Sequence, residues 1–135
     1  MPRPEHVDLA HLLLRKARGD LAVARLIAAD PDPHDDAIGF HAQQAVEKAT
    51  KAVLAFSQAP APRTHDLAYL VELLATHGIE VPATIAEPEW LSPWAVTTRY
   101  DDLDDTLDRH AAIDAAQSAI DWAQELLRQD SCDEG

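Results

Sequence analysis

One segment sets the fold: Phe40-His41-Ala42-Gln43-Gln44-Ala45-Val46-Glu47-Lys48-Ala49-Thr50-Lys51-Ala52-Val53-Leu54. At about 100° per residue, one arc of a helix is apolar and contains Ala45, Ala49, Ala52, Val53 and Phe56. The neighbouring arc, which we name the polar stripe, contains His41, Gln44, Lys48 and Lys51. The segment therefore predicts a helix that presents a core face beside a cationic, hydrogen-bonding stripe.

Apolar residues spaced three and four apart predict further helices on both sides of this one. A first helix is expected over about residues 7–29, ended by Pro31-Asp32-Pro33, and a second over about residues 37–57. Thr64 is the expected N-cap of a third helix that stops at His77-Gly78. Prolines leave only short helical pieces in residues 81–99, and a last helix is expected over about residues 108–129. No stretch alternates like a strand, so we predict an all-α antiparallel bundle of four to five helices.

The length of 135 residues suits one domain. We place it at residues 1–129, followed by an acidic, disordered tail at residues 130–135. The single cysteine, Cys132, excludes a disulfide scaffold and favours the reducing cytoplasm. No apolar signal segment or membrane-spanning run is seen, so no contact with a membrane is expected.

The net charge of −13 is unevenly distributed. Residues 1–63 carry eight Arg or Lys and eight Asp or Glu, whereas residues 64–135 carry three and sixteen. This distribution disfavours broad electrostatic attraction of RNA but leaves room for a local anion site in the first half. The alternative is an acidic, solvated surface that aids solubility.

The polar stripe is the first candidate site. Two ammonium groups, an imidazole and an amide on one helix face could bind an anion or a nucleotide phosphate. The alternative is a solvated or intersubunit face of exposed lysines, in which Glu47 pairs with Lys51 at i,i+4.

Two shorter segments carry the remaining candidates. His65 and Asp66 open the third helix, where capping and packing compete with a binding role. Arg99, followed by Tyr100, could bind a phosphate or a partner carboxylate, or could neutralise the acidic cluster that follows it. Trp90 and Trp94 are expected to be core or dimer anchors.

Metal and cofactor motifs are missing from the sequence. There is no Glu-x-x-His, Cys-x-x-Cys or His-Glu-x-x-His pattern, and no glycine-rich phosphate loop or nucleophile elbow. We therefore expect no metal and no cofactor.

Three segments together resemble the HEPN domain family: Phe40 to Lys48, Arg63-Thr64-His65-Asp66-Leu67, and Arg99-Tyr100. The resemblance implies a small helical bundle, commonly a homodimer, that in many cases pairs with a minimal nucleotidyltransferase in toxin–antitoxin-like systems. Other members of the family are metal-independent ribonucleases, in which an Arg and a His separated by four to six residues act across the dimer interface.

This chain departs from that ribonuclease motif. Ten residues lie between Arg99 and His110, and only one lies between Arg63 and His65. We therefore predict a non-catalytic HEPN interaction module that binds a nucleotidyltransferase or a nucleotide. Its expected binding residues are His41, Gln44, Lys48, Lys51, Arg63, His65, Asp66, Arg99 and Tyr100. The alternative is a divergent ribonuclease toxin that acts on RNA through His41 or His65 with Arg99.

Overall fold

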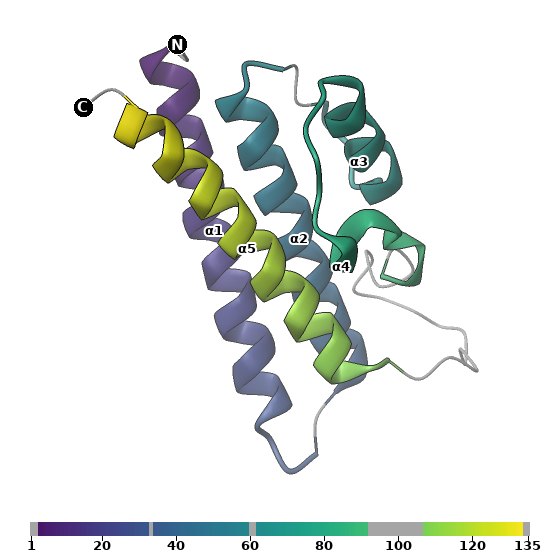
Figure 1. Cartoon of the computed structure of the whole chain (residues 1–135). Coiled ribbons are helices and arrows are strands. Elements are labelled where there is room, and N and C mark those ends of the chain that lie inside the picture. The colour runs from purple at the N-terminus through teal and green to yellow at the C-terminus, as the bar shows by residue number, and fades with distance from the viewer. Residues whose placement is uncertain (1–2, 33, 60–61, 92–106, 134–135) are drawn as a thin grey trace.

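The computed structural model describes residues 3–32, 34–59, 62–91 and 107–133, and most of these residues are helical (Figure 1). The elements are α1 (Pro4–Ala28), α2 (Asp35–Phe56), α3 (Leu67–Thr76), α4 (Ala83–Ala86), the 3₁₀ turn η1 (Pro88–Trp90) and α5 (Arg109–Asp133). No strand occurs in these described ranges. The prediction of an all-α bundle is therefore confirmed.

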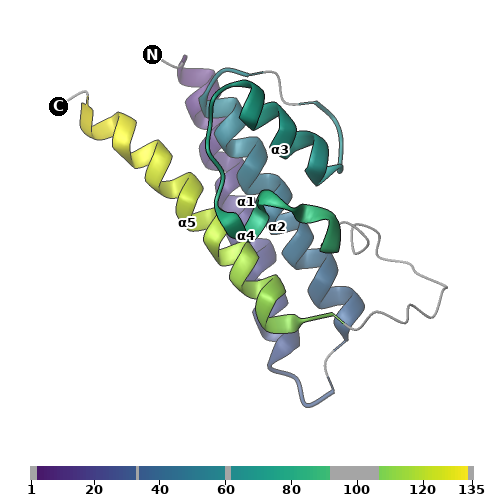
Figure 2. The ribbon, with the colours of Figure 1, turned by 45° about the vertical axis from the view of Figure 1, so that its right-hand side comes forward.

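Helix α2 is the centre of the bundle. It runs antiparallel to α1, packs against α5 and also supports the short helix α3, while α4 lies against α5 (Figure 2). Thirteen of its 22 residues are buried, which is far more than a helix with one solvent face would bury. The second helix therefore has partners on several sides.

Alanine makes this close arrangement of long helices feasible. A short side chain lets two helix backbones approach, because less volume separates the two axes. Fully buried alanines lie on all three long helices: Ala10, Ala17 and Ala24 on α1, Ala42, Ala45, Ala49 and Ala52 on α2, and Ala112, Ala116, Ala119 and Ala123 on α5. Larger side chains such as Leu14, Leu54 and Leu70 fill the remaining space.

The ends of α3 show how local chemistry orients the chain near the candidate site. The N-cap is Asp66 and not Thr64 as predicted, because the Asp66 carboxylate accepts from the backbone N–H of Tyr69 at 3.2 Å. The Thr64 hydroxyl instead accepts from the backbone N–H of Asp66 at 3.1 Å. At the other end, Gly78 has φ of +72° and closes the helix, which agrees with the predicted terminator.

Two other boundaries differ from the prediction. Helix α1 already begins at Pro4, since proline is well suited to the first position of a helix. Helix α5 continues to Asp133, so the tail expected at residues 130–135 is helical through that residue. Residues 109–133 contain no proline and no glycine, so this segment has no earlier stop signal. Residues 92–106, which include Trp94, Arg99 and Tyr100, lie outside the described residues.

Within the described residues, every helix is too short or too polar to cross a membrane.

The alanine packing can be tested with Ala49→Leu. Ala49 is fully buried on α2, so a larger side chain must displace its neighbours. We expect the free energy of unfolding to fall by about 1–3 kcal/mol in a denaturant titration. The control is Ala22→Leu at an exposed position of α1, where the change should stay within about 0.5 kcal/mol. Equal effects of the two substitutions would contradict close packing at Ala49.

Candidate functional site

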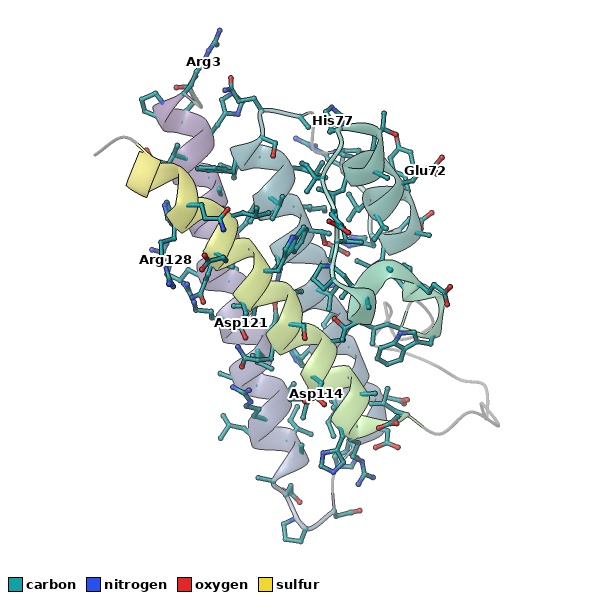
Figure 3. All side chains as sticks on the ribbon, in the orientation of Figure 1. Arg3, Glu72, His77, Asp114, Asp121 and Arg128 are labelled. Carbon is teal, nitrogen blue, oxygen red and sulfur yellow. The ribbon has the colours of Figure 1, made fainter. Side chains whose placement is uncertain are left out.

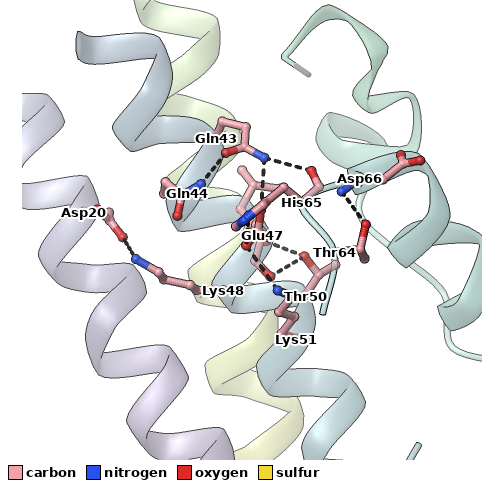
Figure 4. A network of polar contacts seen from close by, with 11 residues as sticks. Asp20, Gln43, Gln44, Glu47, Lys48, Thr50, Lys51, Thr64, His65 and Asp66 are labelled. Atoms are coloured by element: carbon pink, nitrogen blue, oxygen red, sulfur yellow. Dashed lines mark hydrogen bonds and ion pairs between the residues drawn. The ribbon is translucent and has the colours of Figure 1, made fainter. Parts of the chain in front are cut away.

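The polar stripe of α2 contacts two carboxylates that lie on opposite sides of it (Figure 4). One is Asp20 on α1, and the other is Glu47 on α2 itself. Each carboxylate lies within hydrogen-bonding distance of its own group of side-chain nitrogens. The stripe therefore divides into two polar groups, which we name the Asp20 cluster and the Glu47 cluster.

The Asp20 cluster joins α1 to α2. The Asp20 Oδ2 atom lies 2.5 Å from Lys48 Nζ, and Oδ1 lies 2.9 Å from His41 Nδ1. The Asp20 side chain is only 13% exposed, so solvent screens these contacts weakly. One carboxylate on α1 thus fixes two side chains that are seven residues apart on α2.

The Glu47 cluster joins α2 to the start of α3. The Glu47 side chain is 3% exposed, and its Oε2 atom accepts from Lys51 Nζ at 3.3 Å. His65 Nδ1 lies 2.9 Å from Oε1 and 3.1 Å from Oε2, and Gln43 Nε2 donates to Oε1 at 3.3 Å. A buried carboxylate needs such donors, because its loss of hydration is otherwise uncompensated.

Gln43 extends this cluster to the backbone. Its fully buried side chain donates from Nε2 to the carbonyl oxygen of His65 at 3.3 Å, and its Oε1 accepts from Gln44 Nε2 at 2.8 Å. Both ends of the Gln43 amide are therefore satisfied. The segment that leads into α3 is held through both the side chain and the backbone of His65.

The geometry agrees only in part with the sequence prediction. All four stripe residues do take part in polar contacts, but the lysines are not simple exposed charges. Lys48 and Lys51 are mostly buried, and each is neutralised by a carboxylate. Of these two pairs, the sequence predicted only Glu47–Lys51, and it predicted this pair on a solvated or intersubunit face. The two clusters together contribute two ammonium groups and two carboxylates, which leaves little net charge for an incoming anion.

The remaining predicted residues are distributed as follows. His65 belongs to the Glu47 cluster and is 73% exposed, so its outer face meets solvent. Asp66 caps α3, and Arg63 is exposed on the connection before it. Arg99 and Tyr100 lie outside the described residues, so their place relative to the stripe is not defined.

Three features of this site were not predicted from the sequence: the participation of Asp20, the participation of Gln43, and the burial of Glu47 at the centre of a cluster. For the two residues on α2 a signal existed, because Gln43, Glu47 and Lys51 follow one another at i,i+4 on a helix otherwise rich in alanine. The signal for Asp20 is weaker: it is an acidic residue next to Leu21, which belongs to the core.

The arrangement presents an oriented histidine at the surface. The Glu47 carboxylate lies against Nδ1 of His65, whose side chain is otherwise largely exposed. In the part of the chain that the structure describes, no three His, Cys, Asp or Glu side chains gather as metal ligands would.

The central role of Glu47 can be tested with Glu47→Gln. The amide is uncharged and has one acceptor oxygen where the carboxylate has two, so it cannot accept from Lys51, His65 and Gln43 together. We expect the free energy of unfolding to fall by about 1–3 kcal/mol in chemical denaturation. The control Glu72→Gln changes an exposed acid of α3 and should leave stability nearly unchanged. If both variants unfold like the wild type, Glu47 does not organise this region.

Comparison with known proteins identifies the family of this chain. No curated protein and no solved structure matches it. The family model of the HEPN domain, however, matches residues 10–129 of the 135, which includes α2, α3 and both polar clusters. The chain therefore belongs to the HEPN domain family.

Proposed function

We propose that this protein is a HEPN interaction module that forms a homodimer and binds a minimal nucleotidyltransferase or a nucleotide in a toxin–antitoxin-like system. The observation that carries the proposal is an apolar stripe on the solvent face of α1. Its members are Leu9, Leu12, Val23 and Leu26, which are between 36% and 74% exposed. They form two exposed apolar pairs on one helix face, and exposed apolar side chains that share a face are typical of surfaces that bind another protein.

The spacing of this stripe fits a helix–helix interface. With Lys16 and Gly19 included, its residues follow one another at intervals of three, four, three, four and three. This is the seam pattern of paired helices. The core residues of the same helix, such as Leu14 and Leu21, lie on another face, so the described residues of one chain leave the stripe exposed.

The stripe is also complementary to itself in an antiparallel pair. In a two-fold pair centred between residues 17 and 18, Leu9 faces Leu26 of the partner subunit, and Leu12 faces the partner subunit's Val23. The long Lys16 side chain then lies over the partner's Gly19. A Cβ at Gly19 would meet nothing within 4 Å in the single chain, so the fold itself has no need for glycine at this helical position. Close packing against the partner's helix explains the glycine, because a side chain at this position would keep the two helices apart.

The homodimer is tested with Leu12→Glu and Leu26→Glu. Each places a charge in the proposed apolar seam, so the dimer should dissociate to a single chain of 14.8 kDa in sedimentation velocity. The control Tyr69→Glu changes an exposed aromatic residue of α3 and should leave the dimer intact. A wild-type protein that sediments as a monomer at micromolar concentration would overturn the homodimer.

A second candidate function is that of a divergent HEPN ribonuclease. The observation that favours it is His65, whose imidazole is oriented by a buried carboxylate and exposed at its outer face. Two features oppose it. The two lysines of the site are already paired with acids, and the chain lacks the Arg–His spacing of the family's ribonucleases.

For catalysis we expect no cleavage of mixed cellular RNA by the purified protein at low salt, with or without Mg²⁺. The net charge of −13 repels a polyanion, and within the two clusters the lysine nearest His65 is already paired with Glu47. The assay includes a His65→Ala, Arg99→Ala double variant. Cleavage that disappears in the double variant would favour the ribonuclease over the interaction module.

A further inference from the structure

Arg18 and Arg25 lie at the seam between α1 and α5. Their partners are amides, whereas the lysines of the polar stripe pair with carboxylates. Arg25 Nη2 donates to Gln117 Oε1 at 2.5 Å. About two turns closer to the N-terminus of α1, Arg18 meets Gln124, whose amide oxygen accepts from Arg18 Nε at 2.9 Å when it is turned toward the guanidinium. On α1, therefore, two arginines are held by neutral carboxamides of α5.

A pocket opens at the Arg18 end of this seam. Its volume is about 250 Å³, and it is lined by His11, Leu14, Arg18, Gln124, Leu127 and Arg128. Three of these residues come from α1 and three from α5. Figure 3 shows Arg128 on the flank of α5 that lies toward α1. The pocket is thus built by two elements that the core already holds together.

Among the side chains that the structure describes, the charge of this pocket is poorly compensated. The partner of Arg18 is an amide, which orients the guanidinium but does not neutralise it. Arg128 has a carboxylate neighbour in Glu125, but the contact is 3.6 Å long and both side chains are more than half exposed, so the pairing is weak. His11 adds a further nitrogen donor to the wall. In a chain of net charge −13, the pocket is a local cationic site.

The donors and the pocket floor indicate the class of ligand. Guanidinium groups bind phosphate and carboxylate oxygens through paired hydrogen bonds. Here they come from two helices and are joined by an imidazole, and donors on several sides suit a tetrahedral dianion better than a planar monoanion. The buried Leu14 and Leu127 provide an apolar surface beside them. The volume is below that of pockets for drug-sized ligands, so the ligand must be small.

We propose that this pocket binds a small organic phosphate, with the phosphate between Arg18 and Arg128 and the organic part against Leu14 and Leu127. Gln124 is then a positioning residue that holds Arg18 in place. The pocket is separate from the Asp20 and Glu47 clusters, and it does not depend on the α1 stripe.

The test is titration calorimetry of the full chain with phenyl phosphate, inorganic phosphate and benzoate at matched ionic strength. Phenyl phosphate should bind most tightly, because it uses both the guanidiniums and the apolar floor. Arg18→Gln and Arg128→Gln should each weaken its binding by about tenfold or more, since each removes a charged donor. The matched control is Arg25→Gln, which removes an arginine with the same kind of partner outside the pocket and should change affinity less than about twofold.

The variant Gln124→Glu distinguishes loss of phosphate binding from loss of folding. It gives Arg18 a carboxylate partner, so the melting temperature should be kept or raised while phosphate binding is lost. Equal weakening by Arg25→Gln and Arg18→Gln would reveal non-specific attraction and overturn the proposal. Benzoate binding as tightly as phenyl phosphate would overturn the assignment to phosphate, and inorganic phosphate binding as tightly would overturn the assignment to an organic phosphate. Undetectable binding of all three probes would overturn the site.

Discussion

The buried carboxylate of Glu47 is the constraint around which the rest of the structure is arranged. It lies in the middle of α2, the helix with the most partners, and it has almost no contact with water. An ionised group in such a place is tolerated only when several donors surround it. Lys51 and Gln43 come from the same helix, but the closest contact, at 2.9 Å, comes from His65. The chain after α2 must therefore return to this position before α3 can begin.

The packing of alanines in the core also determines the geometry of the Asp20 cluster. Because small side chains occupy the core faces of α1, α2 and α5, the helix backbones come close enough for a short aspartate on α1 to meet Lys48 and His41 on α2. Bulkier core residues would move α1 outward and leave Lys48 partly buried beside no acid. The apolar core and the Asp20 cluster thus depend on the same distance between helices, although they use different interactions.

The sequence predicts the elements of this fold better than it predicts their contacts. The periodicity of residues 40–54 and of the first and last helices depends on burial alone, so it can be read without knowing the partners. The sequence predicts the N-cap of α3 at Thr64, two residues before the observed cap Asp66, because both residue types are good caps and only the path of the chain past Glu47 selects between them. Likewise, the sequence does not predict the pairing of Lys48, because its acid, Asp20, is 28 residues away in sequence. Contacts between helices cannot be inferred from the period of either helix.

The partners of the cations distinguish two kinds of surface on this molecule. Each lysine of the polar stripe lies against a nearly buried carboxylate, so its charge is used within the fold. Arg18, by contrast, lies against a neutral amide, which fixes its direction while its charge remains available. A salt bridge would stabilise the fold more than this contact with a neutral amide does. Stability of the fold therefore does not explain the amide. The amide does, however, prepare the guanidinium for an anion from outside, because the Arg18 side chain is already ordered and loses less entropy on binding. By this reasoning, the lysine charges of α2 stabilise the fold toward α1 and toward the start of α3, and the arginine charge between α1 and α5 serves to bind an anion.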